Sequence, residues 1–232
     1  MINVILPTYN EAENIVPMLK MLGNVLERMK VPYLIILIDD NSPDGTSKIA
    51  KNLEIENLKV IDRPGKLGLG SAYLEGLKHC DYEYTFFMDS DLQHDPFSIP
   101  IMFKKATSGR DYDIVTGTRY SKSGMVCDWP FKRKLCSMTA NTFARCILGL
   151  YTSDLTGSFR CYKTSVLKEI IPKIICKGFG FQMEVIARAE TMNKKIAEIP
   201  ITFFDRIAGD SKLGFKETFA FLKTVILLYF AI

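Results

Sequence analysis

The stretch YTFFMDSD, residues 84–91, indicates both the architecture of the chain and the place of its site. Its first five residues are aromatic, apolar or β-branched, and such a run is typical of a buried strand. Asp89 and Asp91 follow where that strand leaves the sheet, and open α/β sheets bind ligands at the carboxyl ends of their strands. Two carboxylates this close repel each other and lose hydration unless a cation joins them. We therefore interpret this turn as a metal site, with a solvated acidic turn as the alternative.

The expected cation at this turn is Mg²⁺ or Mn²⁺. Both prefer oxygen ligands, and Mg²⁺ is usually held by one or two carboxylates together with substrate phosphates. Asp91 is the expected main ligand, and Asp89 is expected to assist it. The side-chain amide of Gln93 offers a neutral oxygen on the same side as Asp91.

Strand and helix patterns alternate along the first half of the chain. The expected strands cover residues 3–6, 33–38, 58–61, 84–88 and 112–116. The expected helices cover residues 11–29, 44–53, 70–79 and 97–107. This alternation predicts an α/β fold with a mostly parallel sheet covered on both faces. In the second half, helices are expected over residues 163–171 and 181–192 and a strand over 196–204.

Two further polar motifs follow the first two expected strands. The motif PTYNE, residues 7–11, follows the first, and DDNSPDG, residues 39–45, follows the second. Both are therefore expected at the same edge of the sheet as Asp89 and Asp91. The motif KLGLG, residues 66–70, precedes a helix whose N-terminus would favour an anion. The alternative is that these residues serve the turns themselves, with Asp44 capping a helix.

A second polar set comes later in the chain. Arg119 ends the fifth expected strand, while Arg133, Ser137 and Asn141 recur at helical spacing and share one face. Arginine binds phosphate through two parallel hydrogen bonds, so this set is expected to hold a phosphate. Surface salt bridges are the alternative. The basic segment 206–212 is expected to close over metal-bound phosphates.

Composition limits the class of protein. The net charge of +4 over 232 residues is too small to indicate a nucleic-acid partner. The six cysteines are dispersed without a C-x-x-C pair, which disfavours a metal knuckle and fits a reduced, cytosolic setting. No apolar stretch reaches the roughly 20 residues of a membrane-spanning helix. Residues 219–232, FAFLKTVILLYFAI, are nearly all apolar. They are expected to dock on a membrane or a partner, or alternatively to pack on their own domain.

Taken together, these motifs resemble glycosyltransferase family 2. The resemblance runs from Asn3 to about Lys212 and includes PTYNE, DDNSPDGT, MDSDLQHDP and GTRY. It implies an α/β nucleotide-diphosphosugar transferase fold (GT-A, Rossmann-like) over residues 1–212, followed by a docking helix over 213–232. Within the family, the chain resembles the dolichyl-phosphate mannose synthases, in their short form without C-terminal membrane spans.

The resemblance implies a metal-dependent, inverting transfer of mannose from GDP-mannose to dolichyl phosphate. It places the enzyme peripherally at the cytoplasmic face of the endoplasmic-reticulum membrane, held there by small integral membrane subunits. The residues expected to bind the donor nucleotide are Pro7, Tyr9, Glu11, Asp39, Asp40, Asp44, Gly68, Asp89, Ser90, Arg206 and Lys212. Those expected to bind the acceptor phosphate are Arg119, Arg133 and Ser137, and Asp91, Arg119 and Arg133 are expected to be catalytic.

The chemistry of the residues agrees with such an acceptor. No carboxylate outside the metal turn stands out as a general base. A phosphate monoester does not need one, because its second pKa is about 6 and it is largely dianionic at pH 7. Two alternatives stay open: a glucosyl-phosphate-lipid synthase of the same family, and a non-catalytic subunit of a membrane complex.

Overall fold

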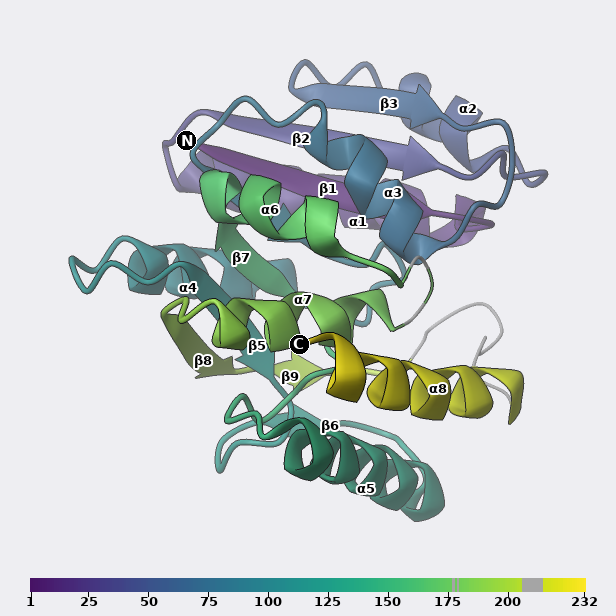
Figure 1. The fold of residues 1–232 in the computed structure, drawn as a ribbon. Coiled ribbons are helices and arrows are strands. Elements are labelled where there is room, and N and C mark those ends of the chain that lie inside the picture. Colours follow the sequence, from purple (N-terminus) through teal and green to yellow (C-terminus); the bar gives the residue numbers. More distant parts are fainter. Residues whose placement is uncertain (177, 179, 206–214) are drawn as a thin grey trace.

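The computed structural model describes residues 1–232 except 177, 179 and 206–214, and only the backbone of 215–219. Its main sheet has seven strands in the order β3-β2-β1-β4-β7-β5-β8 (Figure 1). The strand bounds are β1 (Ile2–Thr8), β2 (Tyr33–Asp39), β3 (Leu58–Asp62), β4 (Tyr84–Phe87), β5 (Ile114–Thr118), β7 (Arg160–Lys163) and β8 (Ile196–Pro200). A separate pair consists of β6 (Met125–Val126) and β9 (Thr202–Phe203).

The expected mostly parallel sheet is confirmed, with one exception. Strand β7 runs antiparallel to both neighbours, β4 and β5, and the other pairs in the main sheet are parallel. The sequence did not indicate β7, because four residues with a cation at each end carry no clear alternation. The expected strand over 196–204 is divided into β8 and β9, which pair in different sheets.

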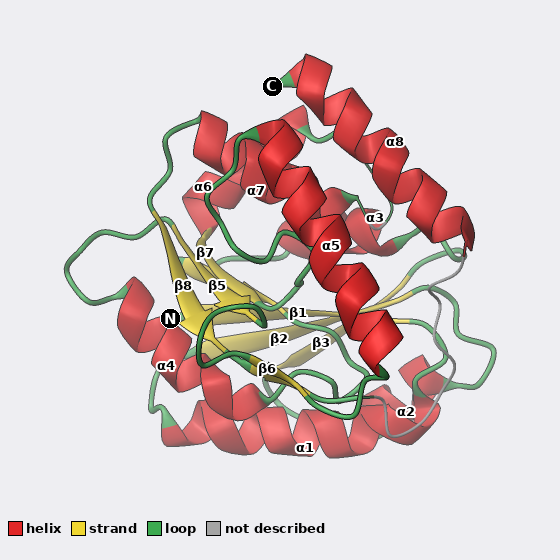
Figure 2. Ribbon diagram, turned by 90° about the horizontal axis from the view of Figure 1, so that it is seen from below, coloured by secondary structure: helices red, strands yellow, loops and turns green. Residues whose placement is uncertain are grey.

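Helices cover both faces of the sheet, as expected (Figure 2). They are α1 (Ala12–Arg28), α2 (Thr46–Lys51), α3 (Leu69–Leu77), α4 (Ile99–Ala106), α5 (Phe131–Leu148), α6 (Thr164–Ile170), α7 (Phe181–Thr191) and α8 (Phe215–Ala231), with 3-10 turns η1 (Pro96–Ser98) and η2 (Ile171–Lys173). Helices α1, α2 and α4 share one apolar core with the sheet, and the other helices line the opposite core.

Close packing of α3 fixes the approach to the site. A Cβ atom built on Gly76 would lie 2.6 Å from the Ile5 side chain, so only glycine lets α3 lie this close to β1. On the same face, the ring of Tyr73 stacks on Phe87 at 4.0 Å between centroids. These contacts hold the N-terminus of α3 near the carboxyl ends of β1 and β4.

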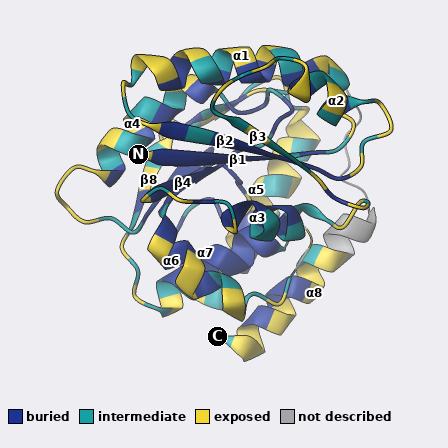
Figure 3. Cartoon of the chain, turned by 90° about the horizontal axis from the view of Figure 1, so that it is seen from above, coloured by how far each residue is buried: buried dark blue, intermediate teal, exposed yellow. Residues whose placement is uncertain are grey.

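Helix α8 packs on the domain with one face and leaves the other exposed (Figure 3). Val225 and Leu228 are buried in the second core, while Ile226 is 61% and Phe230 82% exposed. The segment was expected either to dock on a membrane or partner or to pack on its own domain. The inner face of α8 packs on the domain, and the outer face exposes apolar side chains that could dock. In the described part of the chain, no helix is long and apolar enough to cross a membrane.

Candidate functional site

The carboxyl ends of β1, β2 and β4 lie at one edge of the sheet. β1 pairs with both of the others, and Thr8 at its end faces Asp39 at the end of β2. The hydroxyl of Ser90 donates to the carbonyl of Pro7 at 2.9 Å, which ties the turn after β4 to the end of β1. The prediction that three polar strand ends meet is therefore confirmed.

The turn after β4 holds Asp89 and Asp91 in a fixed conformation. Asp89 accepts hydrogen bonds from the hydroxyls of Tyr73 at 3.2 Å and Ser158 at 2.6 Å. Asp91 is only 4% exposed and accepts from the backbone N–H of Gln93 at 3.2 Å. Leu92, between Asp91 and Gln93, adopts a left-handed conformation with φ of 63°. The Gln93 amide donates to the Phe204 carbonyl at 3.1 Å, which sets its orientation.

The oxygens of this turn fit a hard divalent cation. Two carboxylates and one amide oxygen, from Asp89, Asp91 and Gln93, lie within five consecutive residues. Burial of Asp91 carries a desolvation cost that a bound cation offsets. The donor set is all oxygen, as Mg²⁺ and Mn²⁺ prefer.

His94 stabilises the conformation of this turn. Its Nδ1 accepts from the backbone N–H of Asp89 at 3.1 Å, so the proton of the neutral ring lies on Nε2. The ring stacks on Phe159 at 5.1 Å. Burial lowers the pKa of His94, although the nearby carboxylates of Asp89 and Asp91 oppose the shift. His94 is therefore neutral near pH 7.

The acids after β2 bind their own loops. Asp39 accepts from the Thr8 hydroxyl at 3.0 Å and from the backbone N–H and hydroxyl of Ser42. Asp40 forms a buried ion pair with Arg63 and accepts from the backbone N–H of Leu67 at 3.1 Å. Arg63 also donates to the carbonyl of Gly68, which has φ of 97° just before α3. These bonds hold the glycine-rich segment beside the carboxyl ends of β2 and β3.

Asp44 binds backbone groups near the starts of two helices, and its expected role in donor binding stays a prediction. Its carboxylate accepts from the backbone N–H groups of Thr46 and Ala12, near the starts of α2 and α1. Burial alone would raise the pKa of Asp44, but these bonds and that of the Thr46 hydroxyl outweigh it and lower the value.

The remaining expected donor residues lie around the same loops. Lys66 lies 4.3 Å above the ring of Tyr9, and Glu11 accepts from the Asn14 amide at 2.8 Å. A pocket of about 390 Å³ opens beside the end of β2, and its lining includes Asp39 and Ser42. Arg206 and Lys212 lie outside the described residues, so their expected role stays a prediction.

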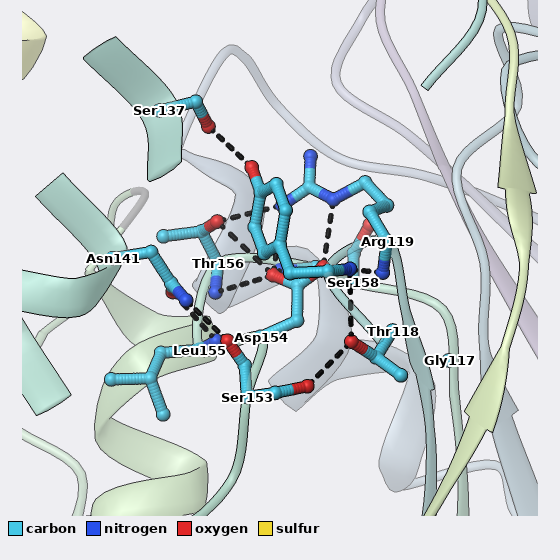
Figure 4. A network of polar contacts seen from close by, with 12 residues as sticks. Gly117, Thr118, Arg119, Ser137, Asn141, Ser153, Asp154, Leu155, Thr156 and Ser158 are labelled. Atoms are coloured by element: carbon cyan, nitrogen blue, oxygen red, sulfur yellow. Dashed lines mark hydrogen bonds and ion pairs between the residues drawn. The ribbon is translucent and has the colours of Figure 1, made fainter. Parts of the chain in front are cut away.

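Arg119 forms the centre of the second polar set (Figure 4). Its Nε and Nη2 donate to the two carboxylate oxygens of Asp154 at 2.7 and 2.8 Å, and Nη2 also donates to Thr156 at 2.7 Å. Both members of the pair are buried. Burial by itself raises the pKa of Asp154, but the Arg119 charge and hydrogen bonds outweigh it and hold that pKa below its ordinary value. The guanidinium therefore has one edge fixed on Asp154.

Helix α5 brings its expected face to this pair. The Ser137 hydroxyl lies 2.7 Å from that of Tyr120, and Asn141 accepts from the backbone N–H of Leu155 at 2.9 Å (Figure 4). Arg133 Nη1 donates to the Asp205 carboxylate at 3.1 Å. The prediction that Arg133, Ser137 and Asn141 share a face is confirmed. Asn141 is buried and fastens α5 to the turn after it.

Comparison with known proteins bears on the family. Residues 3–171 match the model of glycosyl transferase family 2. The chain is 36% identical over 218 residues to polyprenol monophosphomannose synthase of Mycolicibacterium smegmatis, covering 91% of this chain and 80% of that relative. The chain belongs to glycosyltransferase family 2.

Further relatives carry related names. This family 2 glycosyltransferase is 34% identical over 216 residues to undecaprenyl-phosphate mannosyltransferase of Micrococcus luteus, covering 90% of this chain and 86% of that relative. It is 35% identical over 230 residues to dolichol-phosphate mannosyltransferase of Pyrococcus furiosus, covering 97% of this chain and 62% of that relative.

The fold has solved counterparts. The structure of glucosyl-3-phosphoglycerate synthase from Mycobacterium tuberculosis in complex with UDP matches with a TM-score of 0.73 and 18% sequence identity, covering 100% of this chain and 79% of that one. This likeness confirms the expected GT-A fold. The same synthase has also been solved with Mn²⁺ and with Mg²⁺, each together with UDP.

Among the site residues of this family 2 member that sequence reasoning did not find, Arg63 and Trp129 stand out. Arg63 pairs with Asp40, and its only signal was its place two residues after the third expected strand, before the glycine-rich segment. Trp129 stacks on Arg133, with the Arg133 Cζ atom 3.9 Å from the ring centroid. A lone tryptophan just before a basic helix was the signal available there.

Proposed function

We propose that this glycosyltransferase transfers mannose from GDP-mannose to the phosphate of a polyprenyl lipid, with dolichyl phosphate as the specific acceptor and inversion at the sugar. The observation that carries the proposal is the make-up of the acceptor side. There Arg119 and Arg133 both lie over the ring of Trp129, and Asp154 and Asp205 are each paired with one of these arginines. Such a site suits an acceptor that is itself an anion.

The main task of the protein in this reaction is to position the two substrates. An oxygen of the acceptor phosphate forms a bond to the anomeric carbon of mannose, while the bond from that carbon to the diphosphate breaks and the electron pair leaves with GDP. Because the attacking phosphate is already deprotonated, no general base is required. Arg119, Arg133 and Ser137 would bind and orient the phosphate, and Asp39, Asp40 and Arg63 would keep the donor-side loops in place.

A divalent cation is part of this proposal. Asp89, Asp91 and Gln93 would hold Mg²⁺ or Mn²⁺, and when bound this ion offsets the charge that builds on the leaving diphosphate. The metal-containing structures of the fold relative support the assignment.

Exposed apolar side chains on α5 and α8 support a lipid acceptor. Phe131 of α5 is 77% exposed, and Leu135 and Met138 follow it along the same helix. Helix α8, with Ile226 and Phe230 exposed, packs beside α5 (Figure 2). Apolar surface of this kind marks contact with a membrane or a protein. We place residues 1–212 as the catalytic domain at the cytoplasmic face of the endoplasmic-reticulum membrane, with 213–232 docking on lipid or on small integral membrane subunits.

A substrate matrix tests the proposal. The purified chain is assayed with GDP-mannose, UDP-glucose or UDP-GlcNAc against a short polyprenyl phosphate and the corresponding alcohol, with Mn²⁺ or Mg²⁺. We expect transfer only for GDP-mannose with the phosphate. Transfer from UDP-glucose would identify the glucosyl-phosphate-lipid alternative. Absence of any transfer, with donor and acceptor still bound, would favour a non-catalytic subunit of a membrane complex.

A further inference from the structure

Trp129 contacts both arginines of the acceptor side. The Cζ atom of Arg133 lies 3.9 Å from the centroid of the indole, and that of Arg119 lies 5.9 Å from it. Both distances are within the roughly 6 Å over which a cation is attracted to an aromatic face. The indole therefore offers its electron-rich surface to two like-charged groups.

The two arginines differ in how firmly the rest of the protein holds them. Arg119 has a buried, bidentate partner in Asp154. Arg133 is 29% exposed at its side chain, and its ion pair with Asp205 is similarly exposed. Exposed pairs of this kind hold a long side chain weakly, because solvent screens them and the side chain loses rotamer entropy. The close stack on Trp129 is thus the main restraint on the plane of the Arg133 guanidinium.

In its position the indole of Trp129 leaves its own N–H without a hydrogen bond to any described residue. Its Nε1 is buried and has no hydrogen-bond partner in the part of the chain that the structure describes. A buried donor without a partner lowers stability and calls for an explanation. Its position is explained by the two arginines rather than by a hydrogen bond.

Trp129 is also tied to the metal turn. Its ring meets the edge of Phe203 at 5.7 Å, and the ring of Phe203 meets that of His94 at 5.3 Å. Residues 94 and 203 also form a backbone bridge. A continuous row of rings therefore links the turn of Asp89 and Asp91 to the two arginines.

We propose that Trp129 is a positioning residue that fixes the Arg133 guanidinium beside Arg119, so that the pair receives the phosphate of a prenyl-phosphate acceptor. This inference rests on the proposed function for the identity of the acceptor. When the phosphate binds Arg133, the charge facing the indole changes.

The single tryptophan of the chain makes the contact directly observable. The wild-type protein is titrated with geranyl phosphate while the emission of Trp129 is followed, without donor or turnover. We expect a saturable change with geranyl phosphate and none with geraniol, and we expect Arg133→Ala to abolish it. A wild-type emission that does not respond, or a response that persists in Arg133→Ala, overturns the proposal.

Kinetics separate positioning from a general effect on folding. In Trp129→Leu we expect the KM for geranyl phosphate to rise about tenfold. A tenfold change in affinity corresponds to the free energy of a strong cation–π contact. The donor Kd should stay unchanged, and Trp129→Phe should recover most of the loss. Tyr112→Leu removes a comparable contact with Lys105, far from the site, and serves as the matched control.

The outcomes distinguish this inference from the proposed function. If the wild type transfers no mannose, the proposed function fails, and the emission titration still decides the role of Trp129. If the wild type transfers mannose but Trp129→Leu keeps the wild-type KM for geranyl phosphate, the inference alone is wrong. A loss in Trp129→Leu that matches Tyr112→Leu, with donor binding reduced as well, would show a structural role and likewise overturn it.

Discussion

At the scale of single residues, the acids flagged in the sequence owe their behaviour to partners far along the chain. The carboxylate of Asp154 neutralises Arg119, 35 residues earlier. Likewise Asp40 is neutralised by Arg63, which no motif indicated. Residue type and spacing predicted which groups gather at the sheet edge. They did not predict the pairing, because pairing depends on which loops the sheet order brings together.

The buried pair predicts a specific cost of substitution. Asp154→Asn leaves the Arg119 charge buried without a counter-ion, so we expect the free energy of unfolding to fall by about 3–5 kcal/mol. Urea denaturation at pH 7 measures it. Asp205→Asn breaks the exposed pair with Arg133 and should cost no more than about 1 kcal/mol, which makes it the control. Equal costs for the two variants would contradict the assigned burial.

The same pair predicts a pH dependence. The pKa of Asp154 in the folded state lies below its ordinary value of 3.8, so the folded state favours the charged form. The stability gained this way is fully present above that value and is lost as the pH falls from 3.8 through the folded pKa. The difference in unfolding free energy between wild type and Asp154→Asn should therefore be constant above about pH 5 and narrow only in stronger acid. A gap that narrows between neutral pH and pH 5 would assign the effect to another group.

At the scale of elements, α5 and α8 show what periodicity could and could not reveal. The apolar run 219–232 was evident, but its division into a buried and an exposed face was not, because nearly every position is apolar. In α5, basic and apolar residues alternate around Phe131 and Leu135, which hid the exposed apolar side chains. In both helices the face that packs is set by tertiary neighbours.

The two faces of α8 should respond differently to substitution. Ile226→Ser with Phe230→Ser removes exposed apolar surface, so binding to phosphatidylcholine–phosphatidylethanolamine vesicles should weaken at least about tenfold while the melting temperature stays unchanged. Leu228→Ala instead leaves a cavity in the second core and should cost about 2–5 kcal/mol in unfolding free energy. Vesicle sedimentation and thermal unfolding measure the two effects. Undiminished vesicle binding by the double variant would place the membrane contact elsewhere.

At the scale of the whole molecule, the proposed function assigns the donor to the edge of the parallel half of the sheet and the acceptor to the less regular half. The alternation along residues 2–118 predicted the first half well, since apolar strand runs and helical patterns follow one another regularly there and the strands that pair with one another are parallel. Strands β6, β7 and β9 are two to four residues long and pair across large sequence separations. Their pairing could not be predicted locally, and it brings Phe203 into contact both with Trp129 and with His94, which follows β4.

Coupling between metal and donor tests this arrangement across the molecule. A ligand that binds only the folded state stabilises it by about 2.7 kcal/mol at one hundred times its Kd. GDP-mannose at that level should stabilise the wild type by this amount when Mn²⁺ is present, and a chelator should remove most of the gain.

Asp91→Asn keeps an oxygen that can accept from the Gln93 backbone N–H, so the variant should fold normally without ligands. It should nevertheless lose transfer and the metal-dependent gain together, because a neutral amide is a much weaker ligand for a hard cation. Asp111→Asn, which removes an exposed acid paired with Lys163, should behave as the wild type and control for the change in charge. If Asp91→Asn retained the Mn²⁺-dependent stabilisation by GDP-mannose, the cation would have to bind outside the turn after β4, and the division into donor edge and acceptor side would need to be redrawn.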